Sequence, residues 1–359
     1  MGSAGVKNCI CSALIVLLLL GLFASFPVAA EQAAQLCDDI LSIELPRLRG
    51  FQLPGGAITM YDIRGGGTSQ LNPYFSCSAA LGLLAGGDME AAERYIRWHF
   101  GHLEETGIIY DYTVRVEEGA ITEISSLGCD STDSYAALFL VLLDEYAKAG
   151  GVNALLTEHR DAIARVVGAM DATFHFGLTY AKPGYRIYFL MDNCEAAAGY
   201  RAAASLWKQL GSPWQALRCV LRALCIRLAV NLRLWNFRRG SYDYALDTPS
   251  DPAIFYPDAA AQLFPLAFGL LRPSSGRAGR LYRDFLANQP QWLEGHNGGD
   301  YPWVILLRAA LAMGDTDTVA QYLRAVKELC MDGAASGRWY CQESGLAVWA
   351  AVRLKMIGG

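Results

Sequence analysis

The stretch DSTDSYAALFLVLLDEYAKAGGV, residues 130–152, shows the unit from which the chain is built. Its middle is rich in Ala and Leu and is apolar on nearly every side, which is typical of a helix buried all round. The short turn AGGV follows, and then an amphipathic, charged segment at 155–174. This order predicts a helical hairpin whose first helix lies inside the molecule and whose second helix covers it.

The same unit recurs along the chain, which indicates a structural repeat. Further apolar helices are expected at 73–85, 192–209, 257–271, 301–313 and 342–356. Amphipathic helices are expected at 33–47, 88–103, 213–235, 277–288 and 316–330. Together with the opening stretch, these segments predict six inner helices that alternate with six outer ones.

The connections differ in length on the two sides of this repeat. Turns from an inner to an outer helix are short, whereas the return loops are long, at 104–129, 176–190, 236–255, 289–299 and 331–340. The first two alternate like β-hairpins that turn at Glu118-Gly119 and Pro183-Gly184. All long loops lead to the start of an inner helix, so one rim collects them, and functional residues concentrate on such loops.

Six helical hairpins closed into a ring form an (α/α)6 toroid. The phrases CDSTDSYAALFLVLLDEY (129–146), FYPDAAAQLFPLAFGLL (255–271) and DYPWVILLRAALAMGD (300–315) resemble the six-hairpin glycosidase superfamily. The first is distantly similar to the Asp-rich helix start of family 8 glycoside hydrolases. The resemblance covers nearly all of 31–359 and implies one all-α toroid domain with small β-hairpin insertions on the site rim. It also implies a sugar cleft over the starts of the inner helices.

The chain departs from the family 8 pattern at one place. In that family the general acid is a Glu near the start of an earlier inner helix. Here the preceding inner helix begins NPYFSCSAAL (72–81) and has no acid. The catalytic pair of family 8 is therefore not carried over to this chain.

Acidic residues recur at the starts of five of the six expected inner helices. Glycosidic bond hydrolysis uses two carboxyl groups, about 5–5.5 Å apart for retention and about 6.5–9.5 Å for inversion. Our candidate catalytic residues are Asp133, Asp192, Glu195 and Asp258, with Asp258 as a base that activates water. The alternative is helix capping, because Asp130 is placed as a cap and Asp192-x-x-Glu195 fits a capping box.

Aromatic residues share this rim with the acids, and flat amphipathic rings suit the apolar faces of sugars. The candidate substrate-binding residues are Asp130, Tyr74, Tyr135, Tyr256, His296, Asp300, Trp303, Trp339 and Glu343. The expected partner is therefore a carbohydrate, and the function is that of a glycoside hydrolase acting on a polysaccharide or oligosaccharide.

Charge and composition argue against several other classes of partner. The formal net charge is −5 and charged residues make up 18%, which argues against nucleic-acid binding. The five histidines are scattered and no CxxC or HxxxH spacing occurs, so we expect no metal site, and nothing predicts a cofactor. Eight cysteines follow residue 30, and Cys330 and Cys341 are the easiest pair to imagine as a disulfide.

The first 30 residues read as an export signal. Lys7 precedes the apolar run ALIVLLLLGLF (13–23), and Val28-Ala29-Ala30 offers small residues for cleavage. The alternative is an uncleaved N-terminal anchor, because the stretch from Cys9 to Ala30 has no charge. Either case predicts an exported protein, periplasmic or secreted, that meets the membrane only through this segment if it stays uncleaved.

Two other functions remain open at this point. A polysaccharide lyase on the same fold could use Tyr135, Tyr256, His296 and Asn193, although an acid-rich rim would repel a uronate. A non-catalytic carbohydrate-binding or exopolysaccharide-assembly protein fits the missing acid on the first inner helix. Two acids that face each other across a cleft favour hydrolysis, whereas acids used up as helix caps favour binding.

Overall fold

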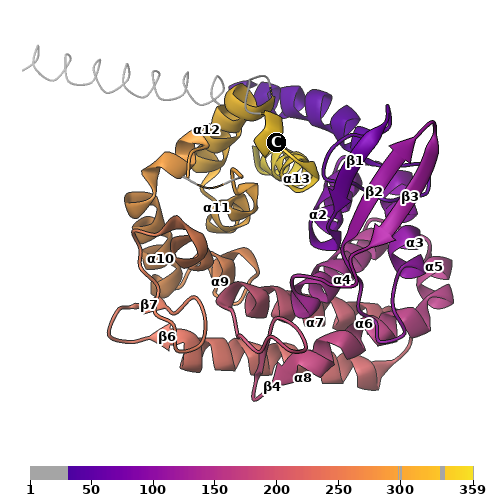
Figure 1. Ribbon diagram of the computed structural model, residues 1–359. Coiled ribbons are helices and arrows are strands. Elements are labelled where there is room, and N and C mark those ends of the chain that lie inside the picture. The colour runs from indigo at the N-terminus through magenta and orange to yellow at the C-terminus, as the bar shows by residue number, and fades with distance from the viewer. Residues whose placement is uncertain (1–30, 298, 300, 332–335, 359) are drawn as a thin grey trace, which may run out of the picture.

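The computed structural model of the chain describes residues 31–297, 299, 301–331 and 336–358, and shows a ring of helices around a central axis (Figure 1). The inner helices are α2 (Pro73–Ala85), α4 (Thr132–Lys148), α7 (Leu190–Gln209), α9 (Phe264–Ala267), α11 (Leu307–Met313) and α13 (Cys341–Gly358). Each inner helix packs against the next, and α13 packs against α2. The inner helices thus close into a ring, which confirms the all-α toroid predicted from the repeat.

An outer layer covers this ring. It comprises a helix at 31–51, α3 (Met89–Gly101), α5 (Asn153–Glu158), α6 (Arg160–Thr173), α8 (Pro213–Ala229), α10 (Gly276–Asn288) and α12 (Thr316–Val326). The hairpin partners α2 and α3, α4 and α6, α7 and α8, and α11 and α12 pack against each other. The Ala- and Leu-rich helices lie inside and the amphipathic ones outside, as burial of apolar surface requires.

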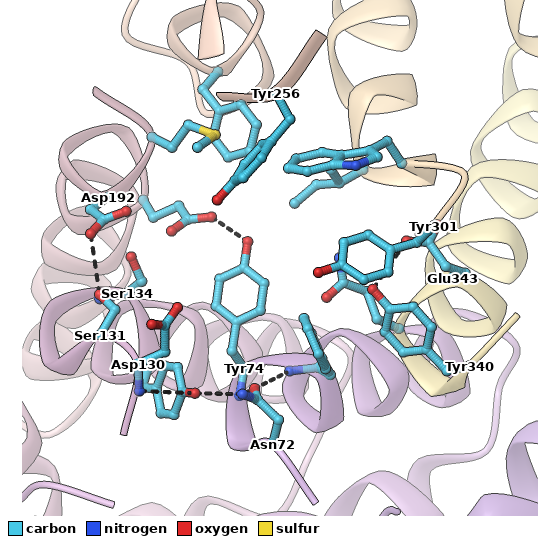
Figure 2. A pocket seen from close by; sticks show the side chains of 18 residues that line it. Asn72, Tyr74, Asp130, Ser131, Ser134, Asp192, Tyr256, Tyr301, Tyr340 and Glu343 are labelled. Carbon is cyan, nitrogen blue, oxygen red and sulfur yellow. Dashed lines mark hydrogen bonds between the residues drawn. The ribbon is translucent and has the colours of Figure 1, made fainter. Parts of the chain in front are cut away.

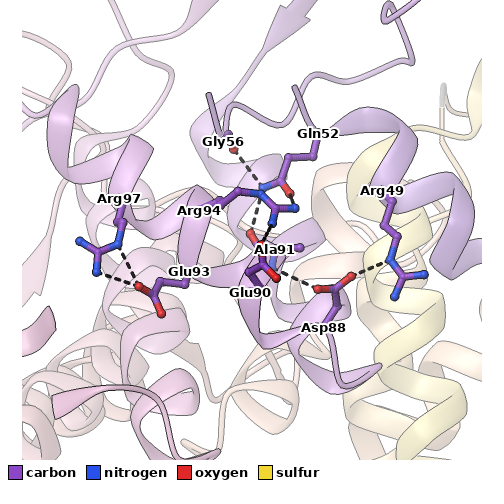
Figure 3. A network of polar contacts seen from close by, with 9 residues as sticks. All are labelled: Arg49, Gln52, Gly56, Asp88, Glu90, Ala91, Glu93, Arg94 and Arg97. Atoms are coloured by element: carbon purple, nitrogen blue, oxygen red, sulfur yellow. Dashed lines mark hydrogen bonds and ion pairs between the residues drawn. The ribbon is translucent and has the colours of Figure 1, made fainter. Parts of the chain in front are cut away.

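Ion pairs and hydrogen bonds fasten neighbouring outer helices (Figure 3). Arg49 of helix 31–51 lies 2.6 Å from the carboxylate of Asp88, which also caps α3 by accepting from Ala91 N. Gln52 donates to the carbonyl of Ala91 at 2.9 Å and accepts from Arg94 at 2.9 Å. One ion pair and two hydrogen bonds therefore hold the helix at 31–51, and Gln52 directly after it, against α3.

Small antiparallel sheets occupy the long loops. β1 (Gly67–Leu71), β2 (Tyr112–Glu117) and β3 (Ala120–Ser125) form a three-stranded sheet with β2 in the middle. The β2–β3 turn lies at Glu118 (φ 50°) and Gly119 (φ 83°), as predicted, and two positive φ values match the twist of a two-residue hairpin. The remaining pairs are β4 (Phe174–His175) with β5 (Leu178–Thr179), and β6 (Trp235–Asn236) with β7 (Ser241–Tyr242).

The predicted turn at Pro183-Gly184 is present, and another turn precedes it in the same loop. The pair β4–β5 turns at Phe176 and Gly177, whereas Pro183-Gly184 closes only a single bridge between Lys182 and Tyr185. Phe176 has φ 48° and Gly177 has φ 87°, values close to those of the two-residue turn at Glu118 and Gly119. The alternation over 177–190 did not reveal the turn at Phe176 and Gly177, because Phe rarely adopts positive φ.

Two inner helices are interrupted near their starts. The segment expected at 257–271 begins as a π-helical turn at Phe255–Ala259 and resumes as α9, whose first turn holds Pro265. The segment expected at 301–313 begins as a 3-10 turn at Val304–Leu306, since Trp303 is left-handed at φ 65°. Proline has no N–H to donate and left-handed residues leave the helical path, so both helices start later than their apolar pattern.

The described residues contain free cysteines and no helix that could span a membrane. All eight cysteines from Cys37 to Cys341 are free, and seven of them are buried, so the pair Cys330–Cys341 is not a disulfide in this structure. No helix in the described part of the chain is long and apolar enough to cross a bilayer. Residues 1–30, on which the export signal was predicted, lie outside the described residues.

Glycines allow the inner helices to approach backbone to backbone. A Cβ on Gly345 of α13 would lie 2.5 Å from the Cα of Ala79 on α2, and one on Gly82 would lie 2.4 Å from the Cα of Gly345. Between α4 and α7, a Cβ on Gly199 would lie 2.6 Å from the Cα of Ala137. The seam between the first and last inner helices therefore depends on missing side chains.

Gly345→Ala should lower the melting temperature, because the new methyl group meets backbone atoms and overpacking of this kind typically costs about 1–3 kcal/mol. Gly168→Ala on α6 is the matched control. Gly168 is helical and exposed, and a Cβ there meets nothing within 4 Å. Alanine at Gly168 should raise stability by roughly 0.5–1 kcal/mol. Thermal unfolding followed by circular dichroism measures both, and equal shifts in the two variants would contradict the close-approach argument.

Candidate active site

A cavity of about 150 Å³ opens at the N-terminal ends of the inner helices (Figure 2). It is lined by Asn72, Tyr74, Phe75, Asp130, Ser131, Ser134, Tyr135, Met191, Asp192, Glu195, Tyr256, Phe264, Tyr301, Trp303, Ile305, Tyr340, Gln342 and Glu343. These residues come from every inner-helix region of the ring, as expected for a site over the helix starts.

The structure brings most of the predicted site residues to this cavity. Those that line it are Tyr74, Asp130, Tyr135, Asp192, Glu195, Tyr256, Trp303 and Glu343. These residues are far apart in sequence, and closure of the ring brings them together around one cavity.

Other predicted residues lie elsewhere. Asp133 is fully buried behind the lining, and the buried Asp258 accepts a hydrogen bond from Asp251 N at 2.7 Å, away from the cavity. His296 is exposed, outside the lining. Trp339 is buried and donates through Nε1 to Glu44 at 2.9 Å. Asp300 lies outside the described residues.

Helix capping does not account for the acids at the starts of α4 and α7. Ser131, not Asp130, caps α4 by accepting from Ser134 N, which moves the helix start one residue along the chain. In α7 the cap position is Phe189, with no side-chain cap, and the helix begins at Leu190. Asp192 and Glu195 therefore do not form the capping box that their spacing allowed, and both face the cavity instead.

The Ser131 hydroxyl links two of these carboxyl groups. Its oxygen lies 2.6 Å from Asp133 Oδ1 and 3.3 Å from Asp192 Oδ2. A hydroxyl has one proton, so it satisfies one carboxylate fully at a time. Asp133 Oδ2 is buried and has no hydrogen-bond partner. The arrangement favours a protonated carboxyl, because an unpaired buried charge is costly.

Burial raises the pKa of each acid in this cluster. The pKa of Asp133 rises to about 7, mainly through desolvation, and the pKa of Glu195 rises to about 8 through desolvation and the charge of Asp192. The pKa of Asp192 is raised well above its usual range by burial and by its neighbour Asp133. Loss of solvent and like charge act together here, so the wall from α4 and α7 holds protons near neutral pH.

Tyr74 reaches from α2 into the middle of the cavity (Figure 2). Its hydroxyl donates to Glu195 Oε1 at 2.6 Å. Arg308 of α11 lies near this pair and partly offsets the rise of the Glu195 pKa, while its own Nε is buried without a hydrogen-bond partner. The hydrogen bond from Tyr74 thus fixes the buried Glu195 carboxyl, whereas Asp192 keeps exposed surface at the cavity wall.

Glu343, in the first turn of α13, lies across the cavity from Asp192 (Figure 2). Val304 N donates to its Oε2 at 2.8 Å, and the Tyr340 hydroxyl lies 3.5 Å from its Oε1. Burial raises its pKa to about 7, against the lowering effect of these donors. The side chain has no exposed surface, because aromatic rings cover it on the cavity side.

Aromatic rings form most of the remaining wall. Tyr256 and Trp303 lie with ring centroids 4.8 Å apart, and Trp303 continues to Tyr301 at 6.1 Å. Tyr301 packs on Tyr340 at 5.3 Å, and Tyr340 packs on Phe75 at 4.9 Å. Tyr256 is 56% exposed, so this arc runs from the open mouth to the covered Glu343.

The lining contains no cation among the described residues, and no group of three or more His, Cys, Asp or Glu in the described chain could hold a metal ion. A cavity with acids, hydroxyls and aromatic rings suits a neutral, hydroxyl-rich ligand.

Several lining residues were not predicted. Asn72 caps α2 and donates to the Tyr135 hydroxyl at 2.5 Å, and Tyr135 in turn donates to Asp111 at 2.9 Å. Asn72 directly precedes Pro73 at a helix start, which was the available signal. Ser131, Gln342 and the apolar Met191 gave no sequence signal, because helix-start residues of these types usually serve the helix alone.

The sequence matches no protein-family model and no curated protein. Its fold is similar to solved structures. A glycosidase variant in complex with glucose has a TM-score of 0.62 and 16% identity, covering 91% of this chain and 98% of that chain. A GH63 mannosylglycerate hydrolase from Thermus thermophilus in complex with glucose has a TM-score of 0.56 and 12% identity, covering 87% of this chain and 99% of that chain.

A rhamnosidase from Klebsiella oxytoca with rhamnose bound has a TM-score of 0.58 and 14% identity, covering 78% of this chain and 57% of that chain. Identities at this level show a shared fold. They confirm the resemblance in architecture to the six-hairpin glycosidases, and the similarity to family 8 stays a prediction.

The acid cluster should make the protein less stable as pH rises. Because the folded-state pKa values of Asp133, Glu195 and Glu343 lie above the ordinary carboxyl value near 4, the folded chain binds more protons than the unfolded chain between about pH 4 and pH 8. The melting temperature should therefore fall as pH rises through this window. Glu195→Gln should flatten the fall, since each pKa unit corresponds to about 1.4 kcal/mol. Glu90→Gln, at an exposed ion pair, is the control, and an equal slope in both variants would refute the assignment.

Proposed function

We propose that the protein is a glycoside hydrolase that removes a sugar unit by carboxyl acid–base catalysis. The observation that carries this proposal is the placement of Asp192 and Glu343, both with raised pKa, on facing walls of an aromatic cavity (Figure 2). The names of the structures with the same fold support a sugar as the ligand.

Asp192 is the proposed general acid. Burial and the neighbouring Asp133 raise its pKa, which favours the protonated form that a general acid needs, and it keeps surface at the cavity. Its proton passes to the glycosidic oxygen as the bond to the anomeric carbon breaks, so the leaving group departs as an alcohol. The Ser131 hydroxyl, 3.3 Å from Asp192 Oδ2, positions this carboxyl.

Glu343 is the proposed general base. Above about pH 7 it is ionised, and the donors Val304 N and Tyr340 stabilise that form. It takes a proton from a water molecule whose oxygen bonds to the anomeric carbon. Because Glu343 is covered, water reaches it when the Tyr340 ring shifts on substrate binding, and such tightening and rearrangement is common in enzymes.

The cavity suits one sugar ring, held against the arc of Tyr256 and Trp303. Its volume of about 150 Å³ lies below the usual range for drug-sized ligands of about 300–1,000 Å³. The rest of a polysaccharide or oligosaccharide extends through the mouth beside the exposed Tyr256. The absence of a cation among the described lining residues disfavours a uronate and hence the lyase alternative.

The site is proposed to work outside the cytoplasm, on the basis of the apolar, uncharged N-terminal segment 9–30 that reads as an export signal. Secretion of the full chain from a producing cell, followed by N-terminal sequencing of the secreted product, distinguishes cleavage near Ala30 from retention of an anchor.

Substitution of the two carboxyls should separate their roles. Asp192→Asn should reduce kcat on alkyl glycosides by about 10²–10⁴-fold, but much less on dinitrophenyl glycosides, whose leaving group needs no proton. Glu343→Gln should reduce kcat similarly on both substrates. Glycosides of glucose, mannose and rhamnose are the first panel. Asp258→Asn, outside the cavity, should keep activity. Sugar binding without hydrolysis by the unaltered protein would instead favour the non-catalytic carbohydrate-binding alternative.

The pH profile of kcat/KM should be bell-shaped. The base must be ionised, so activity rises as pH increases through about 7, the pKa of Glu343. The acid must be protonated, so activity falls at higher pH as the raised pKa of Asp192 is passed. Initial rates on a single glycoside across pH 5 to 10 measure both limbs. A rising limb near pH 4 would remove Glu343 from the role of base.

A further inference from the structure

Outer helix α8 has an exposed apolar stripe that the proposed hydrolysis does not use. Its members are Trp214, Leu217, Leu221, Leu224 and Leu228, followed by Leu232 in the next turn, and each is between 47% and 79% exposed. Spacings of three and four residues place them on one face of the helix. Six large apolar side chains in one row form a continuous patch, which soluble surfaces rarely expose without a partner.

Two hairpin tips carry exposed phenylalanines that extend this patch. Phe176, between β4 and β5, is 80% exposed, and Arg233 donates to its carbonyl at 2.8 Å, so it lies beside the end of α8. Phe237 follows β6 and is 75% exposed. Aromatic side chains at loop tips extend the apolar surface outward from the ring.

Positive charge accompanies the stripe. Between Pro213 and Gly240 the chain has six arginines and no carboxylate, although its formal net charge is −5. Two of them, Arg218 and Arg222, pair with Asp171, and the other four form no ion pair among the described residues. On α3 the arrangement differs, because Arg94 and Arg97 each pair with a glutamate of the same helix (Figure 3).

We propose that the face formed by α8 and the two phenylalanine tips, here called the α8 face, binds the surface of a membrane containing anionic phospholipid. Apolar side chains in a row would enter the boundary between headgroups and acyl chains, as in interfacial amphipathic helices. Arginines beside the row would meet lipid phosphates, with their stems along the apolar surface. The charge complementarity between an anionic surface and the four arginines of this segment that form no ion pair among the described residues selects this partner.

A second copy of the chain fits the same face less well. Two α8 helices packed about a twofold axis would bury the apolar rows, but they would also bring together the arginines of both copies, of which only Arg218 and Arg222 pair with a carboxylate among the described residues. Like charges at close range oppose such pairing. An anionic lipid surface offers phosphates to the arginines that Asp171 does not pair.

The position of the α8 face leaves other parts of the molecule free. α8 lies on the outer wall of the ring, and the helix at 31–51 lies on the far side (Figure 1). The cavity opens among the starts of the inner helices and shares no residue with the stripe. Binding through α8 is therefore separable from the proposed hydrolysis.

Vesicle flotation of the full chain tests this inference. Vesicles of phosphatidylcholine with phosphatidylglycerol should bind the protein, and phosphatidylcholine alone or high salt should weaken binding. Leu221→Glu/Leu228→Glu should lower the partition coefficient at least tenfold, whereas Ile124→Glu, at a 50% exposed site on β3, should leave it unchanged. Circular dichroism verifies that each variant is folded.

A probe on α8 itself gives an independent readout. Cys225 is exposed, whereas the other cysteines in the described chain are buried. A polarity-sensitive thiol dye on the full chain should shift to the blue with anionic vesicles, and Cys225→Ser measures the background. An equal gain in flotation on addition of phosphatidylglycerol for the unaltered chain and the double variant, or no spectral shift, would overturn the proposal. A lipid-free dimer that Leu221→Glu dissociates would replace it with self-association.

Discussion

The close approach of the inner helices is the constraint on which the rest of the structure depends. Gly345 meets α2 at Ala79, and Gly199 meets α4 at Ala137, at distances that admit no side chain. Because the backbones come so near, the starts of all inner helices meet around one small cavity. The same approach removes water from the acids at those starts, and desolvation is the leading cause of the raised pKa values of Asp133, Asp192 and Glu195. Packing and proton affinity thus have a common origin.

The architecture could be predicted because its signals are local. Apolar helices, amphipathic partners and the contrast between short and long connections can all be read within about 20 residues of sequence. The rim was predicted from loop lengths alone, and Tyr74, Asp192, Glu195 and Glu343 line the cavity at that rim. These residues needed only the correct helix and the correct end.

The remainder could not be predicted because it depends on single-residue registers and long-range contacts. Ser131 rather than Asp130 caps α4, and this shift turns Asp133 into the interior. Because α9 starts late, Asp258 lies before it and accepts a hydrogen bond from Asp251 N in the preceding loop. Trp339 donates a hydrogen bond to Glu44, which belongs to the helix at 31–51. The amphipathic pattern of 213–235 predicted an outer helix but not its row of exposed leucines, because the pattern does not tell which apolar residues pack against the inner helices.

The ring is closed by contact between its first and last helices, and this has a consequence for how the protein folds. Tyr74 and Glu343 stand in one cavity but belong to helices near opposite ends of the chain. Contacts so distant in sequence form late, because the loop-closure entropy must first be overcome. An incompletely synthesised or partly folded chain has inner helices but no complete cavity. A complete cavity is therefore a property of the finished molecule, and it forms only when α13 has docked on α2.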